Sequence, residues 1–163
     1  MECTGLNRAI LNSVRASLKG FKQTERNIAA WTREKQQLAR ERDMISLPSH
    51  CSDGLPHSRR TGGSIVERQA MRRERMEERI KAIDLDIRDA RLQLWRIENA
   101  LAALDNLYAG ILKGHYINGA SWFMIGEKFG YCEGSARVYG RRALERLARV
   151  LYRPAVDSST SVS

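Results

Sequence analysis

A group of arginines stands close together near the C-terminal end of the chain. They are Arg137, Arg141, Arg142, Arg146 and Arg149. In the same segment only Glu133 and Glu145 carry negative charge. A guanidinium group stays charged at every physiological pH and can donate paired hydrogen bonds to phosphate oxygens. This density of arginines therefore predicts a surface that binds phosphate groups.

One helix can carry these arginines on a single side. Between Glu133 and Leu151, apolar residues recur at intervals of three and four, which is the period of an amphipathic helix. We expect its buried side to hold Ala136, either Tyr139 or Val138, Ala143, Leu144, Leu147 and Val150. The arginines would then lie on the solvent side.

Two shorter helices are predicted before this one. The first starts near Ala102, and its apolar stripe consists of Leu104, Leu107, Tyr108, Ile111, Leu112 and Tyr116. Asn118 and Gly119 should end it, since both tolerate the left-handed backbone conformation. Ser121 can cap the second helix, because its hydroxyl oxygen can accept hydrogen bonds from free N–H groups. That helix should end at Gly130.

Two small residues stand near this turn. Gly126 is expected where two helices cross closely, and Cys132 is expected to be a small buried side chain. Together the three helices match the helix-turn-helix pattern, in which the last helix enters the major groove of DNA. The alternative is three amphipathic helices with a solvated basic face, because such spacing also arises by chance. The coincidence of helix stops, serine cap and basic last helix favours DNA binding.

Two long heptad seams precede this module. The first helix, within residues 1–45, has an irregular seam of Ile10, Leu11, Val14, Leu18, Phe21, Ile28, Trp31, Leu38 and Ile45. The second, over residues 65–100 and into the next helix, is more regular: Met76, Ile80, Ile83, Ile87, Ala90, Leu94, Ile97, Leu101, Leu104 and Tyr108. Its other faces mix Glu and Arg, which is typical of a solvated surface.

Residues 46–64 are rich in Ser, Gly and Pro, and they predict a flexible loop between the long helices. The helices can then fold back as an antiparallel, coiled-coil-like hairpin, or their seams can pair between chains. Leu85, Leu92 and Trp95 lie off the strict columns and, with the large Trp31, favour further burial in a homodimer or higher oligomer. Residues 153–163 are polar and predict a disordered tail.

Composition limits the other possibilities. A net charge of +9 favours an acidic polymer or surface as partner. No apolar run reaches the roughly 20 residues of a membrane span, and the N-terminal residues lack a signal-peptide pattern, so we expect a cytoplasmic protein with no membrane partner.

Cysteines and histidines give little support for a metal site or a catalytic site. Cys3, Cys51 and Cys132 are odd in number and far apart, which fits reduced thiols. His50, Cys51 and His57 are too few for a zinc site. No residues form a catalytic constellation, so we predict neither an enzyme nor a metal or cofactor.

The C-terminal module resembles region 4 of sigma-70-type factors, the domain that reads the −35 promoter element. The resemblance rests on Tyr116, Gly119, Ser121, Ile125, Gly126, Phe129, Gly130, Arg137 and the run RALERL at 142–147. With its two long charged helices, the whole layout is similar to the phage-encoded RinA/ArpU-type transcriptional regulators.

This resemblance implies a phage or prophage protein that acts in a bacterial host cell. It would bind double-stranded DNA at a promoter of late or packaging genes and activate transcription, and it could contact host RNA polymerase. Within the DNA-binding domain, residues 101–152, the candidate contacts are Ser121, Trp122, Glu133, Gly134, Ser135, Arg137, Val138, Arg141 and Arg142. Glu133, Gly134 and Val138 depart from the base-reading residues of the family, so its target sequence does not carry over.

The alternative function is that of a small terminase-like DNA-packaging protein that oligomerises through its long helices. Such proteins typically place the DNA-binding module first. In this chain the module comes last, which favours the transcriptional regulator.

Overall fold

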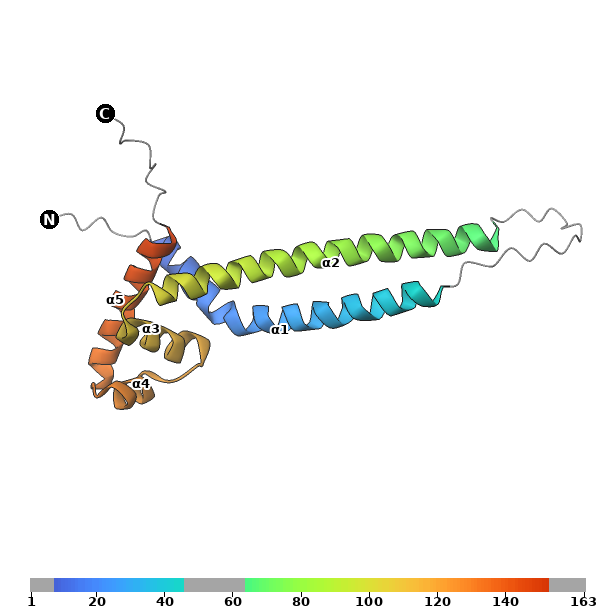
Figure 1. The fold of residues 1–163 in the computed structure, drawn as a ribbon. Helices are drawn as coiled ribbons and strands as arrows, with labels where there is room; N and C mark the ends of the chain where they lie inside the picture. Colours follow the sequence, from blue (N-terminus) through green and yellow to red (C-terminus); the bar gives the residue numbers. More distant parts are fainter. Residues whose placement is uncertain (1–7, 46–63, 153–163) are drawn as a thin grey trace, which may run out of the picture. The chain divides into compact units, whose positions relative to one another are not determined.

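All regular structure in the described part of the chain is helical (Figure 1). The computed structural model describes residues 8–45 and 64–152. Its helices are α1 (Arg8–Met44), α2 (Ile65–Ala102), α3 (Asn106–Leu112), the π-helical turn η1 (Lys113–Ile117), α4 (Trp122–Phe129) and α5 (Glu133–Leu151). The predicted all-α fold, with two long helices followed by a three-helix module, is confirmed.

These residues divide into two compact units, each with its own buried side chains. The hairpin unit consists of residues 26–45 and 64–91, and the terminal unit of residues 8–25 and 92–152. All of the predicted loop 46–64 except Ser64 lies outside the described residues, as do the predicted tail, residues 153–163, and His50, Cys51 and His57.

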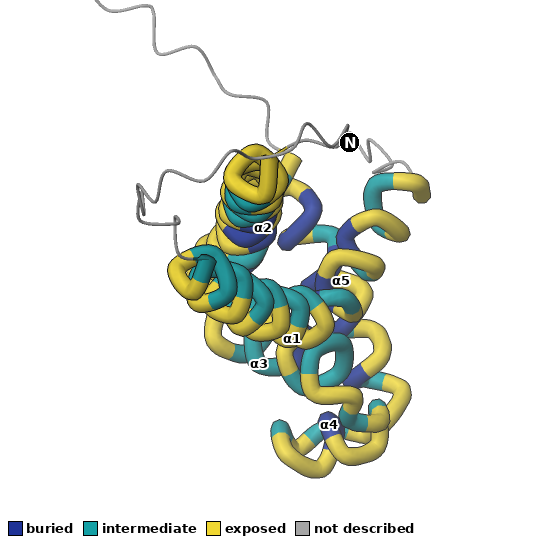
Figure 2. Tube along the Cα trace, turned by 90° about the vertical axis from the view of Figure 1, so that its right-hand side faces the viewer, coloured by how far each residue is buried: buried dark blue, intermediate teal, exposed yellow. Residues whose placement is uncertain are grey.

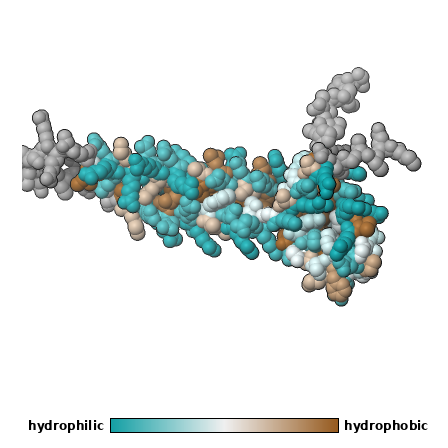
Figure 3. Space-filling view, turned by 180° about the vertical axis from the view of Figure 1, so that it is seen from behind, coloured by the Kyte–Doolittle hydropathy of each residue, from teal (hydrophilic) through white to brown (hydrophobic). Residues whose placement is uncertain are grey.

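The hairpin unit pairs two antiparallel helical segments along a narrow apolar seam. On α2 this seam buries Ile83, Ile87 and Ala90, as the heptad pattern predicts. Two ion pairs join the segments: Lys35 Nζ lies 2.6 Å from Asp84 Oδ1, and Arg79 donates to Glu34 Oε1 at 2.9 Å. The visible surface of this unit is largely hydrophilic (Figure 3).

The terminal unit has a broader core, built from α1, α2, α3 and α5. Its buried residues are Val14, Leu18, Phe21, Ile97, Ala100, Leu101, Leu112, Ala143, Leu144, Leu147 and Ala148. Buried and exposed positions alternate along α5 (Figure 2), which is the expected result of an amphipathic sequence around the helical period. This core fixes α5 and thereby decides which of its residues face solvent.

The predicted burial of Val150 is wrong. Val150 is 41% exposed, because it follows the last buried position, Ala148, near the helix end. Leu85, Leu92 and Trp95, which favoured further burial in an oligomer, are exposed on the single chain. Their burial in an oligomer stays a prediction. Trp31 is half-buried.

Candidate nucleic-acid interface

Helix α4 has the predicted start and end. The backbone N–H of Met124 donates to the Ser121 hydroxyl oxygen at 3.2 Å, so Ser121 is the N-cap. Gly130 closes the helix with φ 75°, a left-handed conformation that costs other residues energy, and its N–H donates to the Gly126 carbonyl. Both predictions are confirmed.

A turn of residues 130–132 then connects α4 to α5, and the two helices pack together. Gly126 makes the tight turn possible: a Cβ at this position would lie 2.5 Å from the carbonyl oxygen of Tyr131. The close approach is thus between a helix and a turn, not between two helices as predicted. Ile111, Ile125 and Ala136 form a small core beneath the turn. The arrangement is a helix-turn-helix.

Trp122 packs α4 against both η1 and α5. Its indole stacks on the His115 ring with centroids 3.8 Å apart, and it occupies the space that a side chain at Gly140 would fill. His115 Nδ1 in turn lies 2.8 Å from the Ala120 carbonyl oxygen. Trp122, a predicted DNA contact, is therefore half-buried and packs inside the module.

The π-helical turn that carries His115 was not anticipated from the sequence. Gly114 in this turn packs against the Ile125 side chain, so η1 approaches α4 closely. A π-turn inserts one residue into the helical repeat, and the apolar spacing alone does not reveal it. The glycines flanking an aromatic-rich segment were the available signal.

The five arginines of α5 are all exposed, but they differ in their partners. Arg146 pairs with Asp105 at 2.9 Å, and its guanidinium lies 4.6 Å from the centre of the Tyr108 ring. Arg137 pairs with Glu133 one turn earlier on the same helix. Arg141, Arg142 and Arg149 have no ion-pair partner among the described residues. Arg146 therefore has a packing role that sequence reasoning missed, since Asp105 is distant along the chain.

The other predicted contacts lie on or near the same surface. Ser121, Glu133, Gly134 and Val138 are exposed, while Ser135 is half-buried. On α5, Gly134, Val138 and Arg141 point within a narrow range of directions, because residues three and four apart share a helix face. We call this set, together with Arg137 and Arg142, the outer face of α5.

Cys132 lies at the N-cap of α5 and is exposed, so the prediction of a buried side chain is wrong. It stands in the turn, outside the small core formed by its neighbours. Its sulfur lies 3.2 Å from the Ser135 hydroxyl. Hydrogen bonds from the Ser135 side chain and backbone lower the pKa of the Cys132 thiol, because they stabilise the thiolate.

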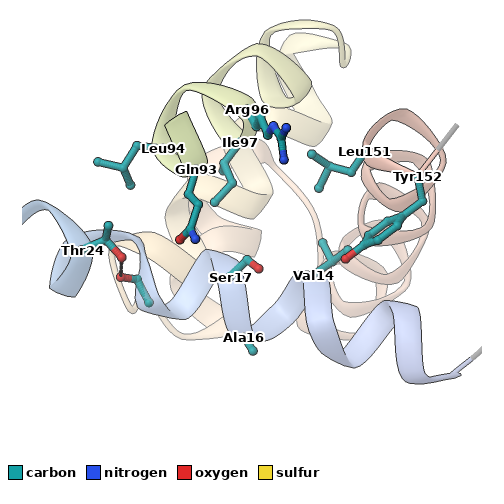
Figure 4. Close-up of a pocket in the computed structure, with 11 residues that line it drawn as sticks. Val14, Ala16, Ser17, Thr24, Gln93, Leu94, Arg96, Ile97, Leu151 and Tyr152 are labelled. Atoms are coloured by element: carbon teal, nitrogen blue, oxygen red, sulfur yellow. Dashed lines mark hydrogen bonds between the residues drawn. The ribbon is translucent and has the colours of Figure 1, made fainter. Parts of the chain in front are cut away.

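A cavity of about 550 Å³ lies elsewhere in the terminal unit, among α1, the end of α2 and the end of α5 (Figure 4). Val14, Leu94, Ile97 and Leu151 supply its apolar wall. Among the described residues, its lining contains no carboxylate, histidine or cysteine.

Within residues 8–45 and 64–152, no group of His, Cys, Asp and Glu side chains is arranged to hold a metal ion. Nor does any helix there combine the length and apolarity that crossing a membrane requires. Compared with protein-family models, curated proteins and solved structures, the chain has no match.

Proposed function

We propose that this protein is a sequence-specific DNA-binding transcriptional regulator in which α5 is the recognition helix. One observation carries the proposal: the outer face of α5 presents Arg141 and Arg142 without ion-pair partners, while the opposite face is anchored in the core. A cation already paired within the chain must break that pair before it contacts phosphate, whereas an unpaired cation need not.

The element before α5 supports the same function. A serine-capped helix, a turn with a left-handed glycine and a basic helix occur in the order that a helix-turn-helix uses. In that arrangement the first helix lies across the DNA backbone and the second enters the major groove. Exposed Ser121, at the start of α4, has a hydroxyl that suits a phosphate contact.

The test compares how tightly two double variants bind double-stranded DNA. Replacing Arg141 and Arg142 with Ala should weaken binding and lower the slope of log K against log salt by about two, since each lost phosphate contact removes about one unit. A matched control replaces Arg88 and Arg91, exposed arginines of α2, with the same loss of charge. If the two double variants lose the same amount of DNA affinity, the placement of the interface on α5 is contradicted.

Transcriptional activation of phage late genes is what the resemblance of the whole layout to the phage-encoded RinA/ArpU-type regulators implies. The regulator should protect one intergenic promoter site when the surrounding phage or prophage DNA is footprinted. Protection confined to a packaging-start site within a terminase gene would instead favour the packaging function. A reporter transcribed from the protected promoter then separates activation from repression.

A further inference from the structure

Among the described residues, some glycines are required by the backbone conformation or the packing of the fold, and others are not. Gly119 and Gly130 have positive φ. A side chain at Gly110, Gly114, Gly126 or Gly140 would meet a neighbouring ring, an aliphatic side chain or the backbone at close range. Gly20 and Gly134 are required for neither of these reasons: their φ is not positive, and a Cβ at either position would meet no atom within 4 Å.

Gly134 is therefore unexplained by the fold. It is exposed in the first turn of α5, where alanine would fit and would favour the helix more. A glycine without a conformational or packing reason within the chain is suited to the close approach of something outside it.

Val138, one turn later on the same outer face, is also unexplained by the fold. Its side chain is 40% exposed and belongs to neither core cluster. As a β-branched residue it is a weaker helix former than alanine or leucine. Arg137 and Arg141 lie to one side of it around the helix and Arg142 lies to the other. An apolar side chain thus stands between arginines, on a face that also carries Glu145 two turns further along.

The major groove of DNA has one apolar group on its base edges, the methyl group of thymine. Phosphates flank this groove on both sides, as the arginines flank Val138. Resting on the proposed DNA-binding function, we infer that Val138 reads a thymine methyl group and that Gly134 lets the start of α5 approach the bases closely. This assigns sequence specificity to two residues that carry no hydrogen-bonding side chain.

The first experiment tests Val138. Duplexes bound by the full-length chain are selected from a random-sequence pool, and each thymine of the selected site is replaced in turn by deoxyuridine, which lacks the methyl group. Binding should weaken about fourfold at one position, the effect of losing a methyl-sized apolar contact. In Val138→Ala the same replacement should have almost no effect. The inference is overturned if no uracil position weakens wild-type binding, or if Val138→Ala responds as strongly as wild type.

The second experiment tests Gly134. Gly134→Ala should retain or raise the thermal midpoint, yet bind the selected duplex about tenfold more weakly, the cost of one lost base contact. Gly20→Ala is the matched control, since its Cβ also meets open space, and its DNA binding should equal that of wild type. If Gly134→Ala binds the selected duplex as tightly as wild type, the inferred close approach of α5 to the bases is overturned. If wild type selects no duplex at all, the proposed DNA-binding function itself fails, which is a separate outcome.

Discussion

The two units of this protein use different means to hold helices together. In the terminal unit, helices and turns approach so closely that glycines face rings or backbone, and a broad core lies beneath α5. In the hairpin unit, a narrow seam and two exposed ion pairs join the segments. We therefore expect the terminal unit to hold its side chains in fixed positions and the hairpin unit to tolerate substitution on most of its surface.

Core truncation should give the largest difference between the units. Leu144→Ala removes a fully buried side chain from the broad core and should lower the free energy of unfolding by about 3 to 5 kcal/mol. Ile83→Ala in the narrow seam should cost nearer 2 kcal/mol, because two helices can close partly over the gap. Urea denaturation followed by circular dichroism measures both, and equal losses would contradict the contrast.

A smaller effect is expected where the terminal unit packs tightly without a large side chain. Gly126→Ala places a Cβ against the Tyr131 carbonyl, which belongs to the backbone and cannot rotate away. We expect a loss of about 1 to 3 kcal/mol, the usual cost of overpacking. Gly20→Ala, with open space at its Cβ, should be neutral or stabilising. A stable Gly126→Ala variant would show that the turn can relax.

The ion pairs of the hairpin unit should contribute least to stability. Both partners of Lys35–Asp84 are more than a third exposed, so solvent screens their attraction. A double-mutant cycle with Lys35→Ala and Asp84→Ala should give a coupling energy of about 0.2 to 1 kcal/mol, decreasing at high salt. A coupling above 2 kcal/mol would mean that ion pairs do hold this unit together.

The lowered pKa of Cys132 should change the reactivity of its thiol, with no measurable effect on the free energy of unfolding. Because its thiol pKa is lowered, the thiolate persists to lower pH than in an ordinary cysteine, so alkylation by iodoacetamide should also persist to lower pH. Ser135→Ala removes the first cause of the shift and should move the reactivity profile to higher pH. Mass spectrometry of the modified peptide follows this residue separately, and an unmoved profile would exclude the Ser135 hydroxyl as a cause of the shift.

Local sequence signals predicted α4 and α5 well, because caps and helix stops act over a few residues. Ser121 and Gly130 bound α4 as expected, and α5 spans Glu133 to Leu151. The same reasoning did not find the π-helical turn or the contact of Arg146 with Asp105 and Tyr108. These depend on residues brought together by folding, for which local periodicity carries no signal.

The sequence by itself determined the all-helical class, the long seams and the basic composition of the last helix, because helical period and charge are properties of residue order. Only the tertiary structure decided which arginines remain unpaired and which glycines the fold requires. Those properties depend on the neighbours of each side chain in space: Arg146 has partners from a distant segment, whereas Arg141 has no ion-pair partner among the described residues. Gly126 meets the turn, and Gly134 meets open space.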